Sequence, residues 1–411
     1  MKGQNYLILF AVFLSLSVYG QFSPKVIDSL NAERSRRLTI KRNLALEALT
    51  RRNPDLCLIL NLNNLELEYL PDLSTYHKIE NLRINNNKLS EIPKYLFLNE
   101  RLKSVDLSSN QIKKLRLHKN ESIQSLDLSK NKLKRFPRSI KKLKNLKVLI
   151  LSNNRIKKVP RFVLKMDALS EIKLNDCQFK LNNRQIRRLK NIKQLQLAKN
   201  NIASLPGNIS LLQNLENLNL AQNKLSSLPP DFIELKNLEH LIFYKNAFTE
   251  IPQVIFQLNK LVEIDFYYNQ LSEIPKEIEQ LENLELLFLS YNQISKIPES
   301  LLHLQKLKAL FIHHNKFLFL PEWIADFKNL EILDLGFNNL QSLPDLSAME
   351  SLYEIDLQEN NLETIPLNLL NKKGLRKIFL TGNPFILDAD EIEEFQKLMD
   401  ELAKKQVRVF F

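Results

Sequence analysis

Leucine and other apolar residues recur along most of the chain in a fixed pattern that includes an asparagine. The pattern is LxxLxLxxNxL, in which x is usually polar, and it begins again every 21 to 23 residues between residues 57 and 385. Within one unit, Leu195, Gln196 and Leu197 alternate between apolar and polar, as expected of a β-strand with one buried face. A repeat of this length predicts coils stacked into one solenoid, with their strands forming a parallel sheet.

The asparagine of each unit defines a ladder position. An Asn side chain carries two N–H donors and a carbonyl acceptor, so it can bond backbone groups where each coil turns away from its strand. We therefore assign the ladder a structural role. A degenerate first coil at residues 57–71 brings the expected number of coils to fifteen. The ladder residues are Asn87, Asn110, Asn131, Asn154, Cys177, Asn200, Asn223, Asn246, Asn269, Asn292, Asn315, Asn338, Asn360 and Asn383.

The segment between two strands favours a short helical turn. In residues 277–281 the apolar side chains lie three apart, which suits one turn packed against a core. Helical turns are wider than strands, so the stack should curve with its sheet inward. We expect residues 21–56 to form an amphipathic helical cap at one end and residues 386–411 a helix and a closing strand at the other. The candidate buried residues of the first cap are Ile27, Leu30, Leu38, Leu44 and Leu49.

These features resemble the leucine-rich repeat superfamily. The segment from Leu205 to Leu215, LPGNISLLQNL, is similar to the 23-residue class of Ras-group proteins and many bacterial relatives. The resemblance implies an α/β fold: a right-handed, curved solenoid with a parallel concave sheet and short helical turns on its convex side. It does not imply one function, because the superfamily serves many partners and activities.

The first twenty residues have the features of an export signal. Lys2 precedes an apolar run from Tyr6 to Val18, and the small residue Gly20 follows where a signal peptidase would cut. The run is shorter than the ~20 residues needed to span a bilayer, although a retained anchor is the alternative. We therefore expect a secreted or periplasmic protein of the cell envelope. Cys57 and Cys177 lie five coils apart, ~24 Å at ~4.8 Å per strand, too far for a disulfide.

Aromatic side chains gather at positions that should face solvent on the concave sheet. In the earlier coils these positions hold small, amide or charged residues, whereas rings replace them from the coil of Asn246 to that of Asn338. Solvent-facing rings on successive coils are typical of a binding site, so we expect protein or peptide recognition here. The alternative is that the rings pack on one another and only cover the leucine layer. The candidate residues are His240, Tyr244, Tyr267, Tyr268, Phe288, Tyr291, Phe311, His313, His314 and Phe337.

Positive charge is concentrated in one part of the chain. Residues 101–193 contain 27 Lys and Arg but only 6 Asp and Glu, a net charge of +21, whereas the whole chain carries +13. Pairs of cations follow the ladder position by three and four residues on three coils, and we call these pairs the basic flank. Its members are Lys113, Lys114, Lys134, Arg135, Lys157 and Lys158.

The basic flank has two interpretations. Like charges one strand apart repel, and a polyanion would relieve the repulsion. The flank could thus contact anionic polysaccharide, lipid headgroups or an acidic protein face, and the chain would then be an envelope-associated structural or adhesive protein. The other interpretation is a solvated surface of a lysine-rich chain. Nucleic acid is not expected, because export argues against it and aromatic residues are not interleaved with the flank.

No motif predicts catalysis. The six glycines form neither a phosphate-binding loop nor a dinucleotide fingerprint, and HExxH and GxSxG are absent. Asp265 and Asp334 lie three coils apart, beyond the reach of a glycosidase pair. His240 and His313 are also three coils apart, ~14 Å by strand spacing, too far to share a zinc ion. We therefore expect a non-catalytic protein without a metal or a cofactor.

Overall fold

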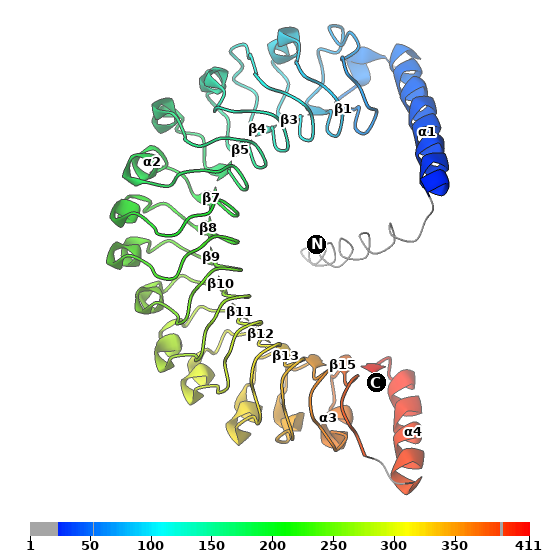
Figure 1. Ribbon diagram of the computed structural model, residues 1–411, viewed down its shortest axis with the longest axis vertical. Coiled ribbons are helices and arrows are strands. Elements are labelled where there is room, and N and C mark those ends of the chain that lie inside the picture. The colour runs from blue at the N-terminus through cyan, green and yellow to red at the C-terminus, as the bar shows by residue number, and fades with distance from the viewer. Residues whose placement is uncertain (1–23, 52, 387–388) are drawn as a thin grey trace.

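The protein forms an open horseshoe whose inner wall is one parallel β-sheet (Figure 1). The computed structural model describes residues 24–51, 53–386 and 389–411. The sheet contains sixteen strands in chain order, β1 to β16, and the short helices lie on the outer side. The fold class expected from the repeat is therefore confirmed. The proposed export signal, residues 1–20, lies outside the described residues.

Every strand is three residues long, and in most of them the central residue alone is buried. In β10, Ile264 is buried while Glu263 and Asp265 are partly exposed on the concave side. The strands are β1 (Ile59–Asn61), β2 (Asn81–Arg83), β3 (Ser104–Asp106), β4 (Ser125–Asp127), β5 (Val148–Ile150), β6 (Glu171–Lys173), β7 (Gln194–Gln196), β8 (Asn217–Asn219), β9 (His240–Ile242), β10 (Glu263–Asp265), β11 (Leu286–Phe288), β12 (Ala309–Phe311), β13 (Ile332–Asp334), β14 (Glu354–Asp356), β15 (Lys377–Phe379) and β16 (Arg408–Phe410).

The outer side consists mainly of single helical turns that follow a proline. Pro275, for example, has φ −70° and directly precedes η8, because proline fixes the backbone but cannot donate a hydrogen bond. The outer elements are η1 (Pro54–Leu56), η2 (Lys94–Leu98), η3 (Arg138–Lys142), η4 (Arg161–Lys165), α2 (Asn183–Arg188), η5 (Gly207–Leu211), η6 (Pro230–Glu234), η7 (Gln253–Gln257), η8 (Lys276–Gln280), η9 (Glu299–His303), η10 (Glu322–Asp326), η11 (Leu346–Ala348) and α3 (Leu367–Leu370).

The ladder asparagines bond the coils to one another. The Asn292 Oδ1 accepts a hydrogen bond from the Leu271 backbone N–H at 2.9 Å. Its Nδ2 donates to the carbonyl of Phe266 in an earlier coil and to those of Leu289 and Ser290 in its own, at 2.8 to 3.2 Å. One buried side chain thus satisfies four backbone groups that the strands leave unpaired, which is the chemistry that Asn can supply and Leu cannot.

Helices cover both ends of the stack. Helix α1 (Pro24–Arg51) contacts the first coils through its C-terminal part, where Leu49 packs on the core and its carbonyl accepts a 2.7 Å hydrogen bond from the Tyr76 hydroxyl. Helix α4 (Ala389–Lys404) lies at the other end (Figure 1), with Leu402 buried. After it, β16 pairs with β15 and closes the last coil.

The prediction of an amphipathic first cap was wrong for two of its residues. Leu30 and Leu44 are 56% and 60% exposed, while Leu38 is only partly buried. The side chain of Ile27 lies outside the described residues. Only the C-terminal part of α1 reaches the first coils, so apolar residues nearer its N-terminus have no core to pack against. Within the described residues, none of the helices is both long and apolar enough to cross a membrane.

Candidate functional site

Strand register and the turns after the strands bring the aromatic residues to the concave wall. Asp265, Phe288, Phe311 and Asp334 occupy the third position of strands β10 to β13 and are paired in register. Two residues further along each coil stand Tyr267, Ser290, His313 and Gly336. The next residues precede the ladder asparagine and are Tyr268, Tyr291, His314 and Phe337.

The last of these rows forms a continuous stack of four rings. The centroids of Tyr268 and Tyr291 are 3.9 Å apart, those of Tyr291 and His314 3.8 Å, and those of His314 and Phe337 4.1 Å. All four residues have φ between 52° and 57°, the left-handed region. Tyr268 and Phe337, at the two ends, are each 39% exposed. The four-ring stack therefore presents aromatic surface to solvent across four coils.

A phenylalanine pair lies on the strands, separate from that stack. The rings of Phe288 and Phe311 are 4.6 Å apart and nearly parallel, with an interplanar angle of 4°. Their register partners on either side are Asp265 and Asp334. Both phenylalanines are half-buried, so two rings with a carboxyl group at each end form a symmetrical row on the wall.

A third group of rings stands two residues after the strands, between the position of the phenylalanine pair and that of the four-ring stack along each coil. Tyr267 contacts Tyr244 at 5.5 Å, Tyr291 at 5.2 Å and His313 at 5.3 Å, measured between ring centroids. Tyr267 is half-buried, and burial raises the pKa of its hydroxyl above the ordinary value. We call Tyr244, Tyr267, Tyr268, Tyr291, His313, His314 and Phe337 together the ring cluster. Its rings touch one another without entering the leucine core.

The carboxyl groups beside the rings are held toward their neutral form. Burial raises the pKa of Asp265 to about 7, that of Asp334 to about 8 and that of Asp356 to about 6. The charge of Asp356 raises the pKa of Asp334 further, whereas the Gly336 N–H opposes the shift weakly with a 3.3 Å bond. Near neutral pH, Asp334 can therefore donate a hydrogen bond to a ligand as well as accept one.

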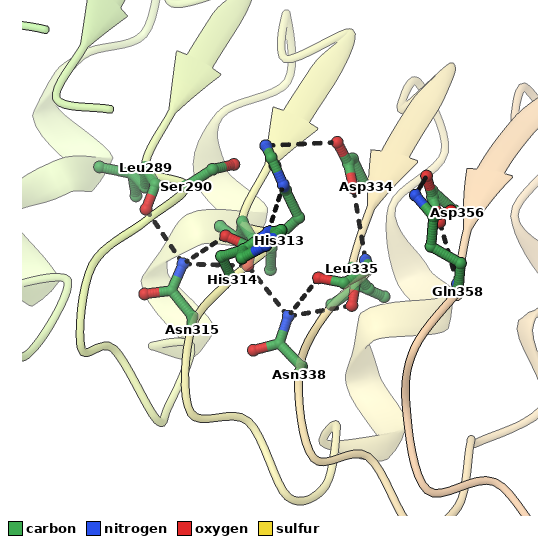
Figure 2. Close-up of polar contacts among 12 residues, drawn as sticks. Leu289, Ser290, His313, His314, Asn315, Asp334, Leu335, Asn338, Asp356 and Gln358 are labelled. Carbon is green, nitrogen blue, oxygen red and sulfur yellow. Dashed lines mark hydrogen bonds and ion pairs between the residues drawn. The ribbon is translucent and has the colours of Figure 1, made fainter. Parts of the chain in front are cut away.

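His313 and Asp334 face one another from adjacent coils (Figure 2). The His313 Nε2 lies 3.9 Å from an Asp334 carboxyl oxygen, and the His313 Nδ1 lies 3.0 Å from the His314 Nδ1. Burial, with a smaller contribution from His314, lowers the pKa of His313 to about 4. A neutral imidazole thus faces a largely neutral carboxyl, which suits recognition by shape, ring contact and hydrogen bonding more than by charge.

His240 lies apart from the other candidate residues. Its Nδ1 is 2.9 Å from the Glu263 Oε2, and this bond raises the pKa of His240. Among the described residues, no ring pair joins His240 to the ring cluster, and its side-chain hydrogen bond is made to Glu263 instead. The sequence-predicted patch is therefore three pieces: the ring cluster, the phenylalanine pair and His240 bound to Glu263.

The fold does not itself require rings at these positions. The left-handed residue before the ladder position is Lys130, Lys199, Gln222 or Glu359 in other coils, with the same φ of 51° to 58°. A left-handed backbone is unfavourable for any such side chain, and an aromatic ring relieves none of that strain. The rings do pack on one another, as the alternative interpretation holds, yet other coils form the same turn without them.

Sequence patterns missed two features of this site. The first is Ser290, fully buried between the Tyr267 and His313 positions, whose hydroxyl has no hydrogen-bond partner among the described residues. The second is the pairing of each phenylalanine with a carboxyl neighbour in register. Aligning the third strand position across coils would have found the second feature, because register follows the repeat.

The basic flank does not act as one unit. Lys113, Lys114, Lys134 and Arg135 line a groove, together with further cations. Lys157 and Lys158 are exposed but do not line it. The regular spacing placed all six residues on one side of the coil but could not show where that surface is recessed.

Within the described residues, no group of three or more His, Cys, Asp or Glu side chains could hold a metal ion. Cys57 and Cys177 are both free and buried. Burial raises the pKa of the Cys177 thiol.

Comparisons with known proteins agree on the repeat. A model described as leucine-rich repeat region matches residues 168–270, and one described as leucine rich repeat matches residues 121–179 and 268–317. A search of curated protein sequences found no match.

Solved structures share the horseshoe. A leucine-rich repeat protein of Leptospira interrogans is 29% identical over 87% of this chain and 97% of its own, with a TM-score of 0.73. An internalin (inlF) of Listeria monocytogenes is 19% identical over 80% of this chain and 85% of its own, with a TM-score of 0.58. A TDR receptor is 25% identical over 75% of this chain and 56% of its own, with a TM-score of 0.56. With the asparagine ladder and the sixteen-stranded parallel sheet, these matches make the chain a member of the leucine-rich repeat superfamily.

Proposed function

We propose that the chain is a non-catalytic scaffold that binds a protein or peptide on its concave wall. The leucine-rich repeat fold commonly serves protein binding, and its curved sheet offers a long surface for contact. The binding site in this proposal consists of the ring cluster and the phenylalanine pair. A peptide side chain would lie over Phe288 and Phe311, while its backbone groups would bond Asp265 or Asp334.

One observation carries the proposal: aromatic surface is exposed across consecutive coils where the fold accepts polar residues. Tyr supplies large contact area at a small cost in side-chain entropy and is enriched at binding hot spots, and Phe is enriched in the buried centre of interfaces. The neutral state of His313 and Asp334 lowers the cost of removing the wall from water when a partner covers it.

The test replaces three rings of the proposed site and leaves the other residues of the concave wall unchanged. Peptides selected from a displayed random library on the native protein are measured against the triple variant Tyr267→Ala, Phe288→Ala and Phe311→Ala. The matched control is the triple variant Lys173→Ala, Gln196→Ala and Asn219→Ala, which changes the third strand position of β6, β7 and β8.

We expect the ring variant to weaken peptide binding by at least about tenfold and the control by less than about twofold. Urea unfolding of both variants checks that each is folded under the binding conditions. Selected peptides that bind the folded ring variant as tightly as the native protein would contradict the proposal.

We further propose that the protein acts outside the cytoplasm. The support is the arrangement of Lys2, the apolar run from Tyr6 to Val18 and Gly20. Expression in its own cells, followed by fractionation and mass spectrometry of the N-terminus, is the measurement. A chain recovered from the cytoplasm with residues 1–20 still attached would overturn the proposal.

A further inference from the structure

Eight exposed cations surround a groove on the solenoid, away from the ring cluster. The groove has a volume of about 1230 Å³ and is formed by the coils that follow β3, β4, β5 and β6. Its apolar lining residues Leu115, Leu133 and Phe136 are each at most 6% exposed, so they form a closed floor. The cations are Lys113, Lys114, Arg116, Lys132, Lys134, Arg135, Arg138 and Arg155.

An irregular coil explains why the surface is recessed here. Asn110 and Asn131 are separated by 21 residues, whereas the adjacent ladder residues on either side follow at 23. The described segment between β3 and β4 contains no helix, unlike the segments before and after it, which contain η2 and η3. Because this coil is shorter and lacks an outer helical turn, it recedes from its neighbours.

The charge in the groove is not balanced within the protein. Asp176 is the acidic residue in the lining, and its carboxylate already pairs with Lys199 at 2.8 Å. Among the residues that the structure describes, none of the eight cations forms an ion pair. The Lys132 Nζ does donate a hydrogen bond to the Gln111 Oε1 at 2.8 Å, but that partner is neutral. Eight positive charges around one recess therefore repel one another without a counter-charge.

We propose that this groove binds a linear anionic polysaccharide, as a second site distinct from the concave wall. Sulfate, phosphate or carboxylate groups recur along such a chain, and the cations of the groove recur on three successive coils. The four arginines can bind these groups with two parallel hydrogen bonds each, while the lysines act as point charges.

The shape of the site argues against other anionic partners. A membrane surface is broad, so it would meet exposed cations outside the groove, such as Lys157 and Lys158, before those that line a recess. Single-stranded nucleic acid needs exposed rings on which bases stack, and the one ring in the lining, Phe136, is buried. An acidic peptide would also need places to bury side chains, and the apolar floor is already closed. Repeated charge on a hydrophilic chain is the chemistry that remains.

The experiment compares two variants of equal charge. The groove variant carries Lys114→Gln, Lys134→Gln, Arg135→Gln and Arg138→Gln. The control carries Lys157→Gln, Lys158→Gln, Lys165→Gln and Lys190→Gln, four cations of the same basic region that do not line the groove. The probe is fluorescent heparin, with uncharged dextran, single-stranded DNA and vesicles rich in phosphatidylglycerol as comparisons.

For the native protein we expect heparin binding that weakens by more than about tenfold when salt rises from about 50 mM to about 300 mM, because bound counterions are released. The groove variant should bind at least about tenfold more weakly and show a shallower salt dependence, while the control changes by less than about threefold.

Three outcomes would overturn the proposal. Equal losses in the two variants would mean that only net charge matters. Vesicles or DNA bound as tightly as heparin, with the same dependence on the groove residues, would assign the groove to another class of partner. If neither the native protein nor the groove variant binds heparin, the groove is not a site for an anionic polysaccharide. Loss of peptide binding on the concave wall affects none of these readouts, so the two proposals fail independently.

Discussion

The rings of Tyr267 and His313 lie 5.3 Å apart although a complete coil separates them in the sheet. Ser290 occupies the equivalent position of that intervening coil and is fully buried. Its small side chain leaves the space in which the two rings meet. The centre of the ring cluster therefore depends on a residue that contributes no ring.

A larger residue at position 290 should separate these rings. We expect Ser290→Leu to lower the free energy of unfolding by about 1–3 kcal/mol, because overpacking a filled site strains its neighbours. The same change should weaken binding of the selected peptides. Ser290→Ala is the control: it removes a buried hydroxyl that lacks a partner, so stability should be unchanged or higher by up to about 1 kcal/mol. Urea unfolding measures both, and a Leu variant as stable as the native protein would show that the rings do not close over Ser290.

The carboxyl of Asp334 should make stability fall with rising pH. Its folded pKa of about 8 lies above the ordinary value of 3.8, so the folded state binds the proton more tightly than the unfolded chain does. The stabilisation is complete below the unfolded pKa and is lost as pH rises toward about 8. Each unit of pKa difference corresponds to about 1.4 kcal/mol as an upper bound.

Asp334→Asn removes this titration and nearly preserves the shape of the side chain. Between pH 4.5 and pH 8 we expect the variant to lose less stability than the native protein, in urea unfolding at several pH values. His313 contributes with the opposite sign, since its lowered pKa costs stability as pH falls below 6.5 toward about 4. Because the native protein and the Asn variant both contain His313, the difference between their pH profiles largely cancels its contribution. Parallel profiles for the native protein and the Asn variant would refute the assignment.

The repeat predicted the sheet well because each position has one physical role. Leu195 and Leu197 face the core and Gln196 lies on the concave side, as the alternation required. The same logic placed Phe288 and Phe311 on the wall. It failed for the cap helix, where Leu30 and Leu44 remain exposed, because apolar spacing says nothing about how far a neighbouring core extends.

Two properties of the candidate sites depend on geometry that the pattern does not encode. Tyr268 and Tyr291 precede the ladder residue, where a left-handed φ turns their side chains into a stack separate from the phenylalanine pair. The basic groove lies at the shorter coil after Asn110, which lacks the helical turn of its neighbours. The spacing of 21 residues was visible in the sequence, but its effect on the surface was not.

Cys177 is the exception in the asparagine ladder, and replacing it should stabilise the protein. In the next coil the Asn200 Oδ1 accepts hydrogen bonds from the backbone N–H groups of Cys177 at 3.0 Å and Phe179 at 2.8 Å. The corresponding donors one coil earlier, on Asn154 and Ile156, face the Cys177 sulfur and partly offset the effect of burial on the thiol pKa. Sulfur is a weak acceptor, so these two N–H groups are poorly satisfied.

Cys177→Asn should offer an amide oxygen as acceptor to both N–H groups. The NH2 group of the new side chain also has two donors for nearby carbonyls, whereas a thiol has only one S–H. We expect the free energy of unfolding to rise by about 1 kcal/mol. Hydrogen exchange of the Ile156 amide should slow in parallel. The reverse change, Asn200→Cys, should cost about 1–3 kcal/mol, since it leaves buried donors without a strong acceptor. A Cys177→Asn variant that is less stable than the native protein would contradict this prediction. It would mean that the packing of this coil fits the sulfur atom, and that side-chain volume affects stability at this ladder position more than hydrogen bonding does.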